Sequence, residues 1–275
     1  MSHPAEPAFL PPDFSPHVTR FFSWWTRDKM VAKKFAAVRI ARGSREHLTA
    51  LADHDGPVIG LMNHVSWWDP LVMLALHSTH WPGRQPYAPM DIAQLRKLGI
   101  FRKIGTFGVD PDDPRSLEAM AGFLADAFAA QPRPAFWINP QGRFEDVRTP
   151  IEVRPGAPRI AADATAAGLG VRAVSVALEY TFWLDPKPEV LIRVEPVEPV
   201  RTNTPGWLRA MRTAMRTNAE RLAALAMTRD PAGFEHLLGD GRAKINPVYD
   251  LWLRLRGKRA DLVDRSRQAG TAAAD

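Results

Sequence analysis

Short apolar runs that alternate with helical stretches fill the middle of the sequence and limit the folds open to it. Four runs read as buried strands, at 57–62, 134–138, 171–180 and 189–194. Three stretches have helical apolar spacing, at 71–77, 116–130 and 157–167. Strands and helices that alternate in this way build a sheet with helices on both faces. The sequence therefore predicts an α/β fold, a mixed sheet sandwiched by helices.

The two ends of the chain are basic and amphipathic. After a proline-rich leader, residues 21–41 mix aromatic with basic side chains, and a long helix is expected over 204–229, followed by a second basic piece at 248–259. Such segments lie on membrane surfaces or pack on their own domain, and the sequence leaves both interpretations open. We expect a leader with a membrane-surface helix (1–45), an α/β domain (46–203) and a basic helical extension (204–275).

The distribution of charge separates the possible partners. The chain has 275 residues and a net charge of +6, but residues 51–200 carry 14 basic and 18 acidic groups, so the excess lies at the ends. An acidic centre argues against a groove for nucleic acid, whereas basic ends favour an anionic membrane surface. The chain has no cysteine, no apolar run long enough to span a bilayer and no signal-peptide pattern. We expect a peripheral protein on the cytoplasmic face of a membrane.

One polar segment stands where α/β proteins place reactive groups. Asn63 and His64 directly follow the 57–62 run, and Asp69 precedes a helical stretch. A carboxylate that contacts an imidazole fixes its tautomer, so the pair is suited to deprotonating an alcohol. The residues alone also permit a structural histidine, with Asp69 capping the helix before Pro70. A metal site that adds His77 and His80 has poor ligand spacing, and we expect no metal.

The blocks around this segment resemble the lysophospholipid and glycerol-phosphate acyltransferase family, which includes 1-acylglycerol-3-phosphate acyltransferases. Asn63-His64 followed by Asp69 is similar to the family's N-H-x4-D box. Three further blocks follow in the family's order, at 91–110, 137–143 and 174–178, and 154–157 resembles its basic-Gly-Ala turn. The resemblance covers about residues 58–180.

The resemblance implies an enzyme that moves a fatty acyl group from acyl-CoA or acyl-carrier protein to a lysophospholipid hydroxyl. His64 would be the general base and Asp69 its partner, with no cofactor or covalent intermediate. Backbone donors near Gly142 would stabilise the oxyanion. The matching positions expected to contact substrate are Asn63, Arg102, Arg115, Gln141, Gly142 and Arg143.

The chain departs from the family pattern where an acceptor phosphate would bind. Gln141 stands in place of the usual Glu, and Arg143-Phe144 in place of Thr-Arg. Pro111 follows Asp110 where an Arg is usual, which leaves Arg115 displaced, and the fourth block has Ser175 in place of Pro. These departures leave two alternatives open. The acceptor could lack a phosphate, as in a glycolipid or carotenoid glycoside, or the protein could be a non-catalytic lipid-binding relative.

Overall fold

The strands of this computed structural model form one mixed sheet. The structure describes residues 7–183 and 186–238, and within them the strand order is β1-β5-β4-β6-β3-β7-β8-β2-β9. The strands from β5 to β7 in this order run parallel, as do β8 and β2, whereas β1–β5, β7–β8 and β2–β9 are antiparallel. The strands are β1 (Phe9–Leu10), β2 (Val38–Ala41), β3 (Val58–Met62), β4 (Gln85–Asp91), β5 (Thr106–Val109), β6 (Pro134–Ile138), β7 (Arg172–Thr181), β8 (Glu189–Val197) and β9 (Phe234–Leu238).

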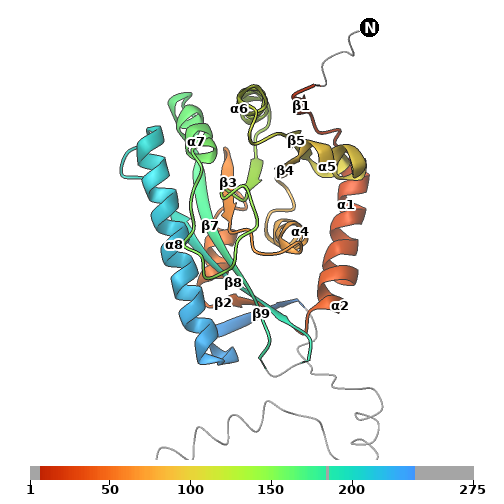
Figure 1. Cartoon of the computed structure of the whole chain (residues 1–275), viewed down its shortest axis with the longest axis vertical. Coiled ribbons are helices and arrows are strands. Elements are labelled where there is room, and N and C mark those ends of the chain that lie inside the picture. Colours follow the sequence, from red (N-terminus) through yellow and green to blue (C-terminus); the bar gives the residue numbers. More distant parts are fainter. Residues whose placement is uncertain (1–6, 184–185, 239–275) are drawn as a thin grey trace, which may run out of the picture.

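Helices cover both faces of this sheet, with α7 and α8 on one side and α1 and α4 on the other in Figure 1. One hydrophobic core joins the sheet to α6, α7 and α8, and a second joins it to η1, α3 and α4. The helical elements are α1 (Pro16–Trp25), η1 (Thr26–Val31), α2 (Ala32–Lys34), α3 (Ser44–Thr49), α4 (Asp69–His80), α5 (Ile92–Lys97), η2 (Gly99–Ile104), α6 (Pro114–Ala130), α7 (Gly156–Ala166), α8 (Thr204–Thr228) and η3 (Pro231–Gly233). The predicted fold, a mixed sheet between helices, is confirmed.

The central strand β3 is buried on both faces. Ile59 and Leu61 belong to the core under α6–α8, and Val58 and Met62 to the core under α4. This alternation explains why the strand reads as a continuous apolar run. Gly60 is required because a Cβ at this position would lie 2.3 Å from the ring of Trp137, which crosses the strand. The close approach packs β6 tightly against β3.

The structure corrects several predicted elements. The segment 21–41 is not one helix, since the helical part ends at Lys34 and residues 38–41 form β2 inside the sheet. The predicted helix at 116 begins at Pro114, because the Asp113 side chain accepts a hydrogen bond from the Arg115 amide and caps it. The helix predicted over 204–229 is found as α8, and the piece at 248–259 lies outside the described residues.

Both terminal segments contribute to the same sheet assembly as the middle of the chain. β1 and β2 come from the first 45 residues, and α8 packs against β7 and β8. Across residues 7–183 and 186–238, no helix has the length and apolarity needed to cross a bilayer.

Candidate functional site

The site begins where β3 ends, between its two parallel neighbours. Leu61 pairs with Ile138 of β6, and Met62 with Val176 of β7. The next residue, Asn63, is buried and forms two hydrogen bonds with the backbone of Leu178, from Nδ2 to the carbonyl at 2.9 Å and from the Leu178 amide to Oδ1 at 2.7 Å. Asn63 therefore holds the start of the loop against β7 through both ends of its amide.

His64 and Asp69 are hydrogen-bonded. The distance from His64 Nδ1 to Asp69 Oδ2 is 2.9 Å, and the His64 side chain is 18% exposed whereas that of Asp69 is fully buried. Because an ionised carboxylate only accepts, Nδ1 carries the proton and Nε2 is free to take one. Within the described residues, Nε2 of His64 has no hydrogen-bond partner. The pair thus has the geometry of a base and its orienting carboxylate.

The Asp69 carboxylate is held by three further donors. Its Oδ2 accepts from the amides of Val65 at 2.7 Å and Ser66 at 2.9 Å, and its Oδ1 accepts from the Tyr180 hydroxyl at 2.8 Å. Asp69 is the first residue of α4, but its side chain reaches back to the loop and does not cap the helix. These bonds compensate the burial of the charge.

Tyr180 is a member of the site that the sequence did not suggest. Burial, and then the charge of Asp69, raise the pKa of the Tyr180 hydroxyl far above its usual range, so it stays a proton donor. The only signal in the sequence is a polar-tipped side chain near the end of the strand predicted at 171–180. That strand lies beside β3, which a single sequence does not reveal.

The loop after β6 wraps around His64. Gln141 Oε1 accepts from the His64 amide at 2.8 Å, and the Glu145 amide donates to the His64 carbonyl at 2.9 Å. The ring of Phe144 lies against the imidazole, with 3.9 Å between centroids and 31° between planes. Gly142 has a φ of +70°, which lets the loop turn back toward β3. Phe144 and Glu145 were not among the predicted site residues.

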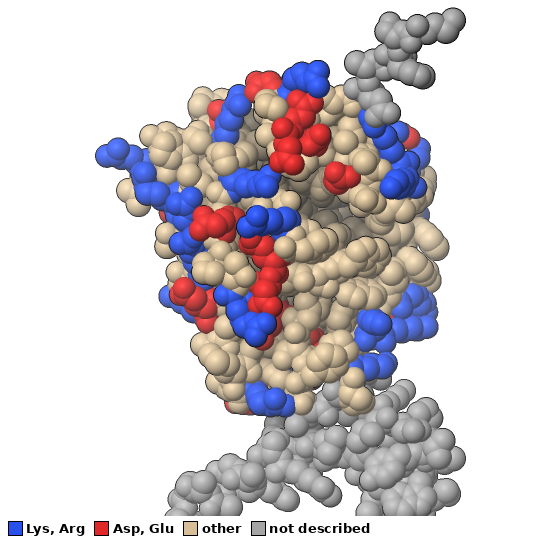
Figure 2. Space-filling model, in the orientation of Figure 1, with Lys and Arg blue, Asp and Glu red and all other residues tan. Residues whose placement is uncertain are grey.

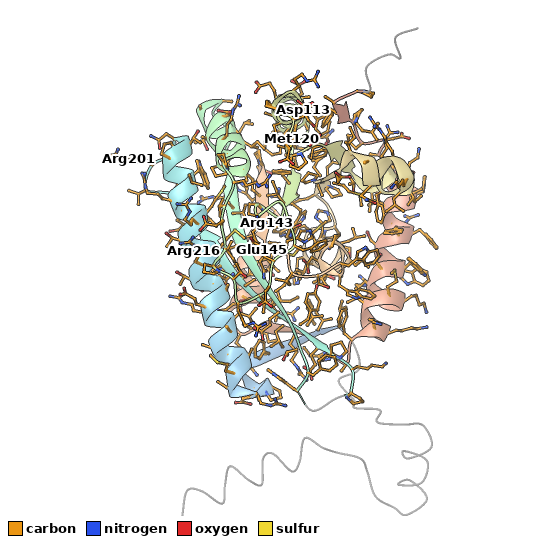
Figure 3. The ribbon with its side chains drawn as sticks, viewed as in Figure 1. Asp113, Met120, Arg143, Glu145, Arg201 and Arg216 are labelled. Carbon is orange, nitrogen blue, oxygen red and sulfur yellow. The ribbon has the colours of Figure 1, made fainter. Side chains whose placement is uncertain are left out.

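The predicted substrate-contacting arginines all have partners within the protein. Arg143 pairs with Glu145 at 2.7 Å, and both are labelled in Figure 3, in the loop between β6 and α7. Arg115 pairs with Asp113 at the start of α6, and the same view labels Asp113 apart from Arg143 and Glu145. Arg102 donates from Nε to the Pro11 carbonyl at 2.9 Å. The structure brings Gln141 into contact with His64, next to Asn63, and places Gly142 and Arg143 in the same loop as Gln141. Arg102 lies on η2 and Arg115 on α6.

The backbone amide of Gly142 is hydrogen-bonded within its own loop. The Gly142 amide donates to the Asn139 carbonyl at 3.0 Å, within the turn.

His77 Nε2 lies 3.1 Å from the Arg84 carbonyl, and His77 Nδ1 accepts from Trp137 Nε1 at 3.1 Å. Burial lowers the pKa of His77 to about 4, so it is a neutral core residue. In the described part of the chain, no three His, Asp or Glu side chains are grouped as metal ligands.

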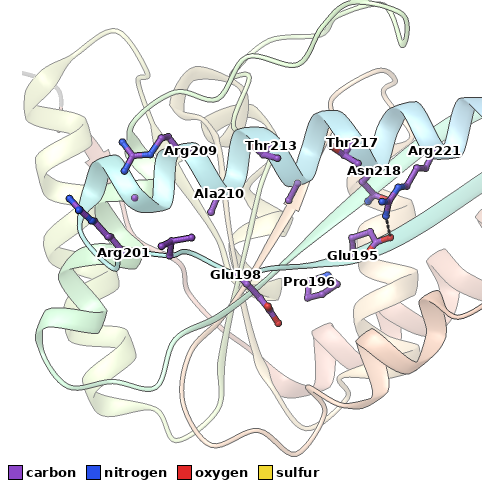
Figure 4. A pocket seen from close by; sticks show the side chains of 13 residues that line it. Glu195, Pro196, Glu198, Arg201, Arg209, Ala210, Thr213, Thr217, Asn218 and Arg221 are labelled. Atoms are coloured by element: carbon purple, nitrogen blue, oxygen red, sulfur yellow. Dashed lines mark hydrogen bonds and ion pairs between the residues drawn. The ribbon is translucent and has the colours of Figure 1, made fainter.

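Two pockets lie near these elements. An apolar one borders the residue after Asp69 and is enclosed by α1, α4, β4 and η2, with Pro70, Leu74, Tyr87, Phe101 and Trp137 in its wall. The other is a polar groove of about 490 Å³ along α8 and β8, where Arg221 contacts Glu195 (Figure 4). None of the residues around His64 lines that groove. The apolar pocket is the one next to the His64–Asp69 pair.

Comparison with known proteins places the chain in a family. The family model described as Acyltransferase matches residues 39–179, just over half of the chain. The solved structure of the 1-acyl-sn-glycerophosphate (LPA) acyltransferase PlsC from Thermotoga maritima is similar at 17% sequence identity and a TM-score of 0.45, over 76% of this chain and 79% of that one. A comparison with curated proteins finds no match. The chain therefore belongs to the acyltransferase family.

Proposed function

We propose that the protein transfers a fatty acyl group from acyl-CoA or acyl-carrier protein to a hydroxyl of a lysophospholipid of the 1-acylglycerol-3-phosphate type. The observation that carries this proposal is the hydrogen-bonded His64–Asp69 pair at the carboxyl end of β3. Open α/β sheets bind ligands at such strand ends. Membership of the acyltransferase family supplies the reaction class.

The proposed reaction is a direct transfer. His64 Nε2 takes the proton of the acceptor hydroxyl while the oxygen attacks the thioester carbonyl, and the Asp69 charge stabilises the imidazolium that forms. The tetrahedral intermediate then collapses, the C–S bond breaks, and the imidazolium returns its proton to the thiolate. The products are an ester and a free thiol.

We also propose that the enzyme works on an anionic membrane surface, with acceptor lipid drawn from it. The exposed aromatic side chains Phe21 and Trp24 lie on α1, and Trp67 is 65% exposed on the His64 loop. Lys29 lies over the Trp24 ring at 5.4 Å, a pairing of aromatic and basic groups suited to the headgroup boundary. In Figure 2 the centre right of the face is largely free of charged side chains and has Lys and Arg along its right-hand rim, whereas groups of both charges lie on the left and upper parts.

A second acceptor class is supported by the ring of Phe144. This side chain occupies the place beside His64 where the family pattern has an arginine, and Arg143 is already paired with Glu145. An apolar ring gives no charge-assisted hydrogen bond to a phosphate. The acceptor in this case is an uncharged hydroxyl lipid, such as a glycolipid or carotenoid glycoside.

An acceptor panel tests the reaction and separates the two classes. The enzyme is incubated with acyl-CoA and either lysophosphatidic acid or a glycolipid, and the released thiol is read with Ellman's reagent. Since the chain has no cysteine, the protein adds no background. We expect transfer by the native protein and by His47→Ala, and loss of about 10³-fold or more in His64→Ala. Full activity in His64→Ala refutes the base assignment, and no thiol release on any acceptor favours a non-catalytic lipid-binding protein.

Vesicle flotation tests the membrane surface. The double variant Phe21→Ser/Trp24→Ser should lose binding to vesicles that contain anionic lipid, and should retain activity on detergent-dispersed substrate. Val200→Ser is the matched control, since Val200 is fully exposed on another part of the molecule. Equal binding by both variants contradicts this placement of the membrane surface.

A further inference from the structure

One short loop, residues 141–145, holds the backbone of His64. The His64 N–H donates to the side chain of Gln141 and its carbonyl accepts from the amide of Glu145, four residues further on. The side chains of these two residues also contact each other, since Gln141 Nε2 donates to the Glu145 carboxylate. The loop therefore closes a ring of hydrogen bonds around the backbone of the proposed base.

The side chain of Glu145 is much less exposed than the side chains on either side of it in the sequence. Its side chain is only 8% exposed, although it belongs to a surface segment. Arg143 donates to the same carboxylate from Nε at 2.8 Å and from Nη2 at 2.7 Å. Hydrogen bonds from Gln141 and Arg143 hold the pKa of the Glu145 carboxyl below its usual range. The group is thus an anion with its acceptor sites turned inward.

A carboxylate at this position decides which way the Gln141 amide points. An amide has a donor end and an acceptor end of nearly the same shape, and a rotation of 180° exchanges them. A carboxylate only accepts, so it binds the NH₂ end and leaves the carbonyl end for the His64 amide. Without the carboxylate, the NH₂ end of Gln141 could face the His64 N–H, and two donors would oppose each other.

We propose that Glu145 is a positioning residue: by orienting Gln141 it fixes the backbone of His64, and with it the imidazole relative to the acceptor. The inference rests on the proposed role of His64 as the base. A change in Glu145 should lower kcat, because misplacing the base costs rate while the acyl chain and headgroup contacts that set KM remain.

The first test compares Glu145→Ala with Asp146→Asn. Asp146 is the neighbouring carboxylate, and among the described residues its side chain bonds only to the exposed Arg148, so its variant is the matched control. We expect kcat to fall about 10- to 100-fold in Glu145→Ala, with KM within about twofold of native, because small errors in the position of a catalytic group are costly. An unchanged kcat in Glu145→Ala overturns the proposal.

The second test exchanges the two groups. Gln141→Glu places two carboxylates face to face, and these ionise fully only at high pH. The activity of this variant relative to native should therefore fall as pH rises. Gln141→Glu/Glu145→Gln restores one amide and one carboxylate, and should remove that pH dependence and recover most of kcat. If the kcat of the double variant is no higher than that of Gln141→Glu, Gln141 and Glu145 do not act as a pair. This test remains decisive if Glu145→Ala fails to fold.

A measurement without substrate separates this inference from the proposed function. Hydrogen exchange of the His64 amide, followed by NMR on the full chain, reports its bond to Gln141 directly. We expect exchange about tenfold faster or more in Glu145→Ala and native rates in Asp146→Asn. Native protection in Glu145→Ala overturns the positioning role. Faster exchange in a protein with no transferase activity leaves the positioning intact and refutes the function.

Discussion

Replacing Asp69 by asparagine should remove the charge beside His64 and leave the fold intact. The asparagine oxygen can take the place of Oδ2 and accept from His64 and from the amides of Val65 and Ser66. Its NH₂ group then faces the Tyr180 hydroxyl, which can rotate to accept. Because every buried polar atom keeps a partner, we expect a melting temperature close to native.

The size of the effect follows from the loss of one ion pair in the transition state. Two unit charges about 4 Å apart attract by about 4 kcal/mol at an effective dielectric constant of about 20. The asparagine oxygen still accepts a hydrogen bond, which retains about 1 kcal/mol. The remaining loss of about 3 kcal/mol corresponds to a fall in kcat of about 10²-fold. Asp69 is fully buried and His64 is mostly buried, and solvent therefore screens little of the attraction between the two charges.

The assay is the release of thiol from acyl-CoA at saturating acceptor, with thermal melting of the same preparation. Asp69→Asn should show a low kcat, a KM close to native and a native-like transition. A folded variant that keeps more than about a tenth of the native kcat refutes the assignment of Asp69 as the group that stabilises the imidazolium.

Three further predictions concern stability. Adding Tyr180→Phe to Asp69→Asn should lower the free energy of unfolding by about 1–3 kcal/mol, because the asparagine NH₂ is left buried without an acceptor, and chemical denaturation measures it. Gly60→Ala should cost about 1–3 kcal/mol or more through the clash with the indole of Trp137. Gly122→Ala should not lower the melting temperature, because no atom of the described residues outside α6 lies within 4 Å of the added Cβ. The pKa of His77 is about 4 in the folded chain against 6.5 normally, so this histidine binds more protons in the unfolded chain between these values. His77 should therefore contribute a loss of about 3 kcal/mol to the free energy of unfolding as pH drops from 6.5 to 4. Denaturation of His77→Gln over this pH range should show a smaller loss in the free energy of unfolding than native. An equal loss contradicts the assignment of this pH dependence to His77.

The parts of the fold that the sequence predicts are those with strong local patterns. The buried runs that became β3, β6, β7 and β8 carry continuous apolar residues, and α8 has long apolar spacing with Asn203 as its cap. The strands that were missed have no such pattern. β4 contains two prolines, and β2 pairs with β8 and β9, which are far away in the chain. Pairing of this kind depends on tertiary contacts.

The residues of the site also divide into those that the sequence predicts and those that depend on tertiary contacts. His64 and Asp69 lie five residues apart, and their spacing within one loop is visible in the sequence. Tyr180 reaches Asp69 across 111 residues, and only the pairing of β7 with β3 brings them together. Phe144 was noted only as a departure from the family pattern. Its stacking on His64 depends on how the loop after β6 folds back.

The place of β3 in the sheet determines how the enzyme should lose activity on heating. β3 is hydrogen-bonded along its length to β6 and β7, whereas β1 is a two-residue strand at the sheet's edge. Edge elements open at low free energy, and central strands open only when the whole domain unfolds. The half-life of activity at high temperature should therefore equal the lifetime of the folded state. Substitutions that tighten the β1 edge should leave that half-life unchanged, and an engineer who wants a longer-lived catalyst should slow global unfolding.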